Sequence, residues 1–134
     1  MKSYTDLEQS KKLAEILPLK SADMYFNGHQ SITNPKEWKY EDAPKVRGKY
    51  IAFDDKRIFY PCWSLAALLG VLESEIYDED GNTYELKIEK EGTWWWIEYI
   101  ERYGEASPIE TNSTEELIDA CYEMIVKLKE LNLL

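Results

Sequence analysis

Hydrophobic residues recur with a helical spacing near both ends of this chain. Residues 5–17 carry apolar side chains every three or four positions and open with Thr5-Asp6-Leu7-Glu8, a sequence typical of a helix capping box. Residues 113–131 show a longer apolar stripe that begins after Ser113-Thr114-Glu115-Glu116, a second capping-box sequence. We therefore expect a first helix over residues 5–17 and a last helix that docks its apolar stripe on a sheet.

A third helix is predicted in the middle of the chain, where residues 61–72 carry no charged side chain. Pro61 begins this segment, and proline suits the first turn of a helix because its missing N–H has no helical partner there. The small residues Ala66, Ala67 and Gly70 would let another backbone approach closely. Because a helix that is apolar nearly all round is buried, we expect residues 61–72 at the centre of the core.

Two other segments show the alternation of a β-strand. Apolar and charged residues alternate over 84–89, and Glu91-Gly92 supplies a turn into a second strand over residues 93–103. Residues 75–77 are expected to pair upstream across an Asp80-Gly81 turn, which completes a β-meander.

A separate β-hairpin is predicted from residues 49–53 and 58–60, which are rich in aromatic and β-branched side chains. Residues 27–48 are polar and broken by prolines, so we interpret them as a long functional or mobile connection that follows a turn at Asn27-Gly28. The predicted fold class is α+β: an antiparallel sheet of about four or five strands, a β-hairpin plus a β-meander, packed with three helices.

Three consecutive tryptophans lie in the second strand of the predicted meander, at positions 94 to 96. Successive strand side chains point to opposite faces, so indole rings project from both faces of the sheet. Trp95, Ile97, Tyr99 and Tyr103 belong to the more apolar set, which we assign to the core. A helical spacing also fits residues 96–103, but the β-propensity of this segment favours a strand.

The opposite set of side chains on this strand is the candidate interaction surface, because soluble monomers rarely leave large apolar patches in water. It comprises Trp94, Trp96 and Ile100. Trp38 and Tyr40 are added to it from the polar connection, where they alternate with lysines as aromatics do in single-stranded nucleic-acid binders. Acidic neighbours in the same stretch favour docking on the protein's own acidic half instead.

Charge is distributed unevenly over the 134 residues, whose formal net charge is −10. Residues 1–60 hold 11 Lys and Arg against 9 Asp and Glu, whereas residues 61–134 hold 5 against 17, a net charge of −12. Such a surface repels phosphate backbones and anionic lipids, which disfavours nucleic-acid and membrane partners. With no apolar leader sequence and enough residues for one core, residues 1–134 are expected to form a single globular domain in the cytoplasm.

No catalytic, cofactor or metal signature is present in the sequence. Cys62 and Cys121 lie on apolar stripes of predicted helices and are expected to be buried thiols, although a helix start could lower the pKa of Cys62. His29 is the one histidine and stands outside any motif. Asp78 begins a partial calcium-loop pattern, but Thr83 replaces the glycine that this loop needs. We therefore expect no cofactor and no metal, and the sequence disfavours an enzyme.

Four blocks of the chain resemble a known group of sequences: Glu8-Gln9-Ser10-Lys11-Lys12-Leu13, Ser21-Ala22-Asp23-Met24-Tyr25, residues 61–69 (PCWSLAALL) and residues 119–125 (DACYEMI). They are similar to a family of small uncharacterised proteins from gut Bacteroidetes and their prophages or mobile elements. The resemblance spans the chain and is interrupted mainly over residues 27–48. It implies a small cytoplasmic accessory protein without assigned activity or known catalytic residues.

Three classes of function remain open at this stage. The leading hypothesis is a protein-interaction module that binds an unknown protein partner or a second copy of itself through the aromatic strand, since interface cores favour Trp and Tyr. The alternative is an acidic mimic or inhibitor of a basic partner. The third is a small ligand-binding domain or enzyme with a pocket under residues 27–48.

Overall fold

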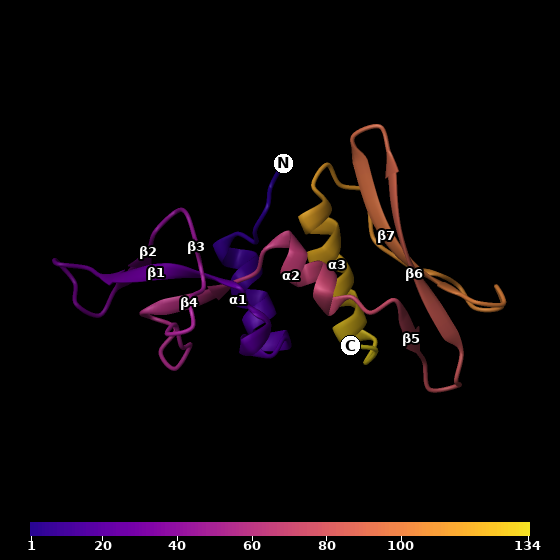
Figure 1. Cartoon of the computed structure of the whole chain (residues 1–134), viewed down its shortest axis with the longest axis horizontal. Coiled ribbons are helices and arrows are strands. Elements are labelled where there is room, and N and C mark those ends of the chain that lie inside the picture. Colours follow the sequence, from indigo (N-terminus) through magenta and orange to yellow (C-terminus); the bar gives the residue numbers. More distant parts are fainter. The chain divides into compact units, whose positions relative to one another are not determined.

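A computed structural model describes all 134 residues and divides them into two compact units. The N-terminal unit comprises residues 4–67, and the C-terminal unit comprises residues 68–134 together with residues 1–3. The fold is α+β, with three α-helices and two antiparallel sheets of four strands each, which confirms the predicted class while dividing the strands between two sheets (Figure 1). The organisation of residues 1–134 as a single globular domain stays a prediction.

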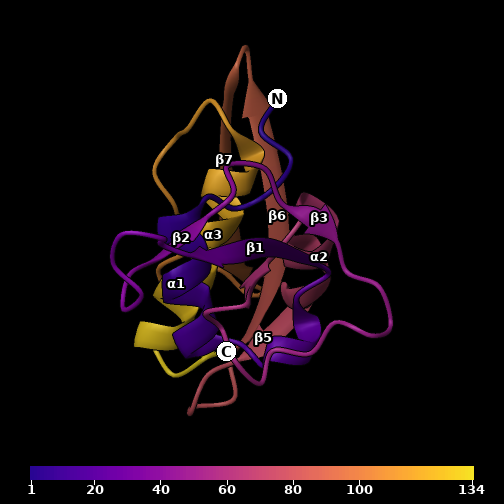
Figure 2. The same ribbon diagram turned by 90° about the vertical axis from the view of Figure 1, so that its left-hand side faces the viewer.

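The N-terminal unit contains a sheet centred on one strand. Strand β1 pairs antiparallel with each of the other three strands, and helix α1 packs against β4. Figure 2 shows β1 running across α1. The elements of this unit are α1 (Leu7–Ile16), a 3-10 turn (Leu19–Ser21), β1 (Met24–Gln30), β2 (Trp38–Tyr40), β3 (Lys45–Val46), β4 (Phe59–Cys62) and the start of α2 (Leu65–Val71).

The C-terminal unit is a four-stranded meander with the order β5-β6-β7-β8, and α3 packs against β7 (Figure 1). Its elements are β5 (Glu75–Tyr77), β6 (Thr83–Glu91), β7 (Trp94–Glu101), β8 (Ile109–Glu110) and α3 (Leu117–Glu130). The predicted meander, its Asp80-Gly81 turn and its Glu91-Gly92 turn are confirmed. Gly81 and Gly92 adopt φ values of +79° and +61°, a left-handed conformation that glycine tolerates and other residues rarely adopt.

The predicted buried helix over residues 61–72 is wrong at its start and in its burial. Pro61 and Cys62 belong to β4, and α2 begins at Leu65 with only Leu68 buried. The cap is Ser64, whose Oγ accepts the amide of Ala67 at 3.1 Å and donates to Asp23. The apolar run is therefore a buried strand followed by a short helix, two elements that periodicity alone does not separate.

The predicted hairpin over residues 49–60 is also wrong, because 49–53 form no strand and β4 pairs with β1 instead. The Arg47 guanidinium lies 4.5 Å from the centre of the buried Phe53 ring and donates to the carbonyls of Ala22 and Ile51. These contacts hold the segment as a loop. The predicted connection over 27–48 is partly wrong as well, since β1 continues to Gln30 and both β2 and β3 lie within this range.

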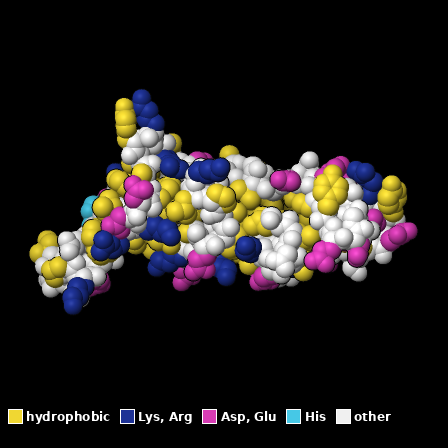
Figure 3. Space-filling model, turned by 90° about the horizontal axis from the view of Figure 1, so that it is seen from below, with side chains coloured by type: hydrophobic (Ala, Val, Ile, Leu, Met, Phe, Trp, Pro, Cys, Tyr) yellow, Lys and Arg dark blue, Asp and Glu magenta, His cyan; other side chains and the backbone are white.

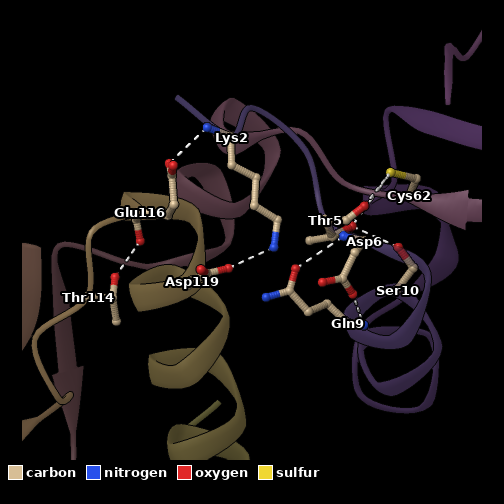
Figure 4. A network of polar contacts seen from close by, with 9 residues as sticks. All are labelled: Lys2, Thr5, Asp6, Gln9, Ser10, Cys62, Thr114, Glu116 and Asp119. Atoms are coloured by element: carbon tan, nitrogen blue, oxygen red, sulfur yellow. Dashed lines mark hydrogen bonds and ion pairs between the residues drawn. The ribbon is translucent and has the colours of Figure 1, made fainter. Parts of the chain in front are cut away.

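The structure differs from the predicted capping box at the start of both helices. The first capping box consists of Asp6 and Gln9, because the hydroxyl of Thr5 is buried and bonds Ser10 at 2.8 Å (Figure 4). At α3 the N-cap is Glu116, which makes no side-chain capping bond. Its carboxylate instead accepts the backbone N–H of Lys2 at 2.8 Å, so the chain start is tied to this helix (Figure 4).

Gly28 lies inside β1 rather than in the predicted turn, and close backbone packing explains the glycine. A Cβ atom at this position would lie 1.7 Å from the carbonyl oxygen of Arg57. We predict that Gly28→Ala lowers the free energy of unfolding by about 3 kcal/mol or more, since the obstacle is backbone and cannot rotate away. Denaturant unfolding followed by circular dichroism measures this loss.

Gly48→Ala is the matched control, because a Cβ atom there meets nothing within 4 Å. Its free energy of unfolding should stay within about 1 kcal/mol of the parent value. Equal stability of the two variants would contradict the proposed close approach at Gly28.

Candidate interaction surface

The two faces of the C-terminal sheet follow from the register of β6 and β7. Tyr84 lies opposite Glu101, and the pairing continues without interruption to Glu91 opposite Trp94. Residues directly opposite one another in an antiparallel pair project to the same face, and successive residues alternate. One face therefore carries the even-numbered side chains of β6 with the odd-numbered ones of β7, and the other face carries the rest.

The first of these faces is the inner face, on which α3 packs. Ile97 and Tyr99 are fully buried there, and the hydroxyl of Tyr99 donates to the carbonyl of Glu73 at 2.7 Å. Burial raises the pKa of Tyr99 to about 12, so this phenol remains neutral. The core assignment of Ile97 and Tyr99 is confirmed, and Trp95 is half-buried. The core assignment of Tyr103 is wrong, because β7 ends at Glu101 and Tyr103 is exposed in the turn that follows. The alternative helix over residues 96–103 is also wrong.

The opposite face is named the outer face. Its members, identified from the register and from the ion pairs of Arg102, are Glu75, Tyr77, Thr83, Glu85, Lys87, Glu89, Glu91, Trp94, Trp96, Glu98, Ile100, Arg102 and Glu110. The predicted surface residues Trp94, Trp96 and Ile100 are thus brought together on one strand.

Apolar groups on the outer face are open to solvent. Trp94 is 47% exposed, Ile100 is 37% exposed and Tyr77 is 61% exposed, while Trp96 is half-buried. Tyr77 was missed at the sequence level, because a strand of three residues gives too short an alternation to assign its side chains to a face. The cross-strand pairing of β5 with β6 is the observation that places it here.

Acidic side chains surround these apolar groups, with six glutamates against one lysine and one arginine. Arg102 pairs with Glu75 at 2.8 Å and Glu85 at 3.1 Å, and Lys87 pairs with Glu89 at 2.8 Å. Hydrogen bonds to these carboxylates raise the pKa of both basic groups. Both cations are therefore already neutralised within the face.

Three glutamates of the outer face form no ion pair: Glu91, Glu98 and Glu110. Figure 3 shows the wider distribution of charge, with Lys and Arg side chains gathered over the N-terminal unit and acidic side chains more frequent over the C-terminal unit. The face can therefore accept positively charged groups beside exposed indole and alkyl surface.

Trp38 and Tyr40 belong to β2 in the other sheet and form a separate cluster. The Arg57 guanidinium lies 5.6 Å from the Trp38 ring centre. Tyr40 donates its hydroxyl to the carbonyl of Lys56 at 2.7 Å and packs edge-on against Tyr60. Both rings are half-buried, and these contacts lie inside their own unit.

The two cysteines are fully buried and unpaired. Burial raises the pKa of Cys62, and it raises the pKa of Cys121 to about 12. Cys62 lies in β4 and contacts the backbone carbonyl and hydroxyl of Thr5, so the helix start proposed to activate it does not exist (Figure 4). Neither sulfur is available as a nucleophile.

The remaining polar residues singled out in the sequence also have structural partners. His29 is exposed, and its Nε2 lies 2.9 Å from the carboxylate of Glu41, a contact that lowers the pKa of Glu41. The Asp78 carboxylate accepts both the backbone and side-chain N–H of Asn82 and the amide of Asp80, which lowers the pKa of Asp78. Asp78 thus organises the β5–β6 turn through hydrogen bonds.

A cavity of 540 Å³ opens beside this turn, lined in part by Tyr77, Asp78, Tyr84 and Leu131. No residue of 27–48, under which the ligand-binding alternative placed a pocket, belongs to its lining. The Tyr84 hydroxyl, which borders this cavity, is 3.3 Å from Asp78. The Tyr84 hydroxyl and the Asp78 carboxylate therefore bond each other at this cavity.

Comparison with protein-family models, with curated proteins and with solved structures finds no match for this chain. Each helix is too short or too polar to traverse a lipid bilayer.

We predict that Cys62 and Cys121 resist a thiol reagent at pH 8 in the folded protein and react fully after denaturation, because burial both blocks access and favours the protonated form. Absorbance of the released thiolate from an aromatic disulfide reagent measures the labelling. A Ser113→Cys variant, at an exposed position, is the positive control and should react in the folded state. Fast labelling of the parent protein would contradict the inert assignment.

Proposed function

We propose that this protein is an interaction module that binds a basic protein partner through the outer face. The observation that carries the proposal is the combination of exposed Trp94 and Ile100 with an excess of glutamate on one side of a rigid sheet. Tryptophan is among the residues that most often dominate binding energy at interfaces. The surrounding acids discriminate against acidic partners and accelerate encounter with basic ones.

The cellular setting belongs to the same proposal. Two unpaired thiols support a reducing compartment such as the cytoplasm. The resemblance of four sequence blocks to small proteins of gut Bacteroidetes and their mobile elements supports an accessory role rather than a catalytic one. A second candidate function, an acidic mimic that inhibits a basic partner, is favoured by the three outer-face glutamates that form no ion pair.

We predict that Trp94→Ser weakens binding of the captured partner by at least about 2 kcal/mol, the loss typical of a central tryptophan. The measurement is affinity capture with immobilised protein, followed by titration of the recovered partner in a calorimeter. Tyr50→Ser is the matched control, because Tyr50 is 86% exposed and lies in the other unit. Equal binding by both variants would remove the outer face from the interface.

A double variant, Glu91→Gln with Glu98→Gln, separates the interaction module from the acidic mimic. We predict a weaker and less salt-sensitive interaction whose apolar part survives, since only charge is removed. Titrations at low and high salt measure this dependence. Binding that vanishes in the glutamine variant but is unchanged in Trp94→Ser would favour the mimic.

A further inference from the structure

Strand β6 is paired along its whole length on one side and along less than half of it on the other. Its pairing with β7 covers Tyr84 to Glu91, whereas β5 pairs only with Thr83, Tyr84 and Glu85. The last bond on the β5 side runs from the Leu86 amide to the carbonyl of Ser74 at 2.9 Å. From residue 87 to residue 91, β6 is therefore an edge strand.

The direction of the backbone groups on this edge follows from their alternation. In an antiparallel strand the N–H and C=O of one residue point to the same side, and the next residue points to the opposite side. Leu86 directs its N–H toward β5, and Thr83 accepts the amide of Arg102 on the β7 side. Ile88 and Lys90 consequently direct two N–H and two C=O groups to the open edge.

The opposite edge of the same meander is treated differently by the chain. β8 pairs with Glu98 and Tyr99 of β7, the Thr111 amide bonds the carbonyl of Ile97, and Trp95 exchanges two backbone bonds with Thr114. Segment 109–114 thus covers β7 nearly to the hairpin. β6 has no such cover, no proline and no bulge in its register, so the charged side chains of residues 87 and 89–91 are the protection that this edge carries.

We propose that an extended basic segment of the partner protein adds to the sheet as a strand along residues 86–91 of β6. This inference rests on the proposed function and names how its partner is held. Backbone bonds to Ile88 and Lys90 would supply the pairing, as in other recognition by strand addition. The added strand would continue the outer face past β6 and lie beside Glu89 and Glu91.

The side-chain pattern of the added strand follows from its neighbours. On the outer face it meets Glu91, which forms no ion pair, and the Lys87–Glu89 pair, so lysine or arginine fits beside Glu91. On the inner face it meets Ile88, which is 38% exposed, and Lys90, whose ammonium lies 4.8 Å from the centre of the Trp95 ring, so apolar residues fit beside Ile88. The matching segment alternates basic and apolar residues.

A second copy of this chain fits the edge less well than a basic segment. Each copy carries a net charge of −10. The antiparallel self-pairing that uses the backbone of both Ile88 and Lys90 also places Glu89 opposite Glu89 of the other copy. Like charges directly opposite one another destabilise a strand pair.

The test uses the full chain and the synthetic peptide acetyl-Thr-Lys-Val-Lys-Val-Lys-Thr-amide as probe. Hydrogen exchange followed by NMR should show the amides of Ile88 and Lys90 protected at least about tenfold when the peptide is bound, since each becomes hydrogen-bonded. Two N-methylated forms of the peptide are compared, one methylated on its lysines and the other on its valines. Their affinities should differ at least about tenfold, because only one of them loses the N–H groups that face the edge of β6.

Two further variants make the result decisive. Lys90→Pro removes an edge-facing N–H without removing a bond to β7, and it should abolish peptide binding while a far-ultraviolet spectrum and an unfolding curve confirm the fold. A peptide with glutamate in place of lysine should not bind. Weak or absent binding of the basic peptide, equal binding of both methylated forms, or edge protection from dimerisation without peptide would overturn the inference.

These outcomes are distinguishable from failure of the proposed function. If Trp94→Ser weakens binding of the captured partner but Lys90→Pro does not, the outer face is the interface and strand addition is wrong. If neither variant changes the affinity for the captured partner, the proposed function itself is wrong.

Discussion

The antiparallel pairing of β6 with β7 determines what every other part of the C-terminal unit can do. A shift of one residue in this register would move Ile97 and Tyr99 from the core to solvent and bring the neighbouring tryptophans and charges inward. Gly92 at the hairpin fixes the turn, and the Tyr99 hydroxyl anchors the far end to the carbonyl of Glu73. Because the core and the turn specify the same register, the distribution of indoles between the two faces is a consequence of folding.

The end of β7 shows how the covered edge of this sheet is built. Glu101 projects to the inner face and is only 3% exposed, an expensive position for a carboxylate. Its Oε2 accepts the amides of Tyr103 and Glu105, each at 2.9 Å, and Gly104 adopts a φ of +70°. These bonds reverse the chain so that segment 109–114 returns along β7. A buried acid therefore helps to close one edge of the meander. Residues 87–91 of β6 have no comparable segment paired along their open side.

The C-terminal unit could be predicted well from sequence because its determinants are local. Alternation over 84–89, glycine turns and a strongly amphipathic last helix all lie within a few residues of what they specify. The N-terminal sheet was predicted poorly because its strands are short, and β4 joins β1 across more than thirty residues. Gly28 illustrates the difficulty: it signals a turn in the sequence, whereas the structure requires it for contact with Arg57. On the outer face, Trp94, Trp96 and Ile100 followed from strand parity, but Tyr77 needed the pairing of β5.

Exposed tryptophan has a cost that the charge pattern of this protein offsets. An apolar patch on a sheet face promotes indiscriminate association, and an open strand edge adds backbone groups that any extended chain could use. Glutamates around Trp94 and along β6 make acidic and neutral chains poor partners while leaving basic ones favoured. Lys87, held by Glu89, interrupts the acidic row without creating a site for anions. Under the proposed function, the side chains that limit indiscriminate association also select the partner, so face, edge and charge act together as one recognition surface.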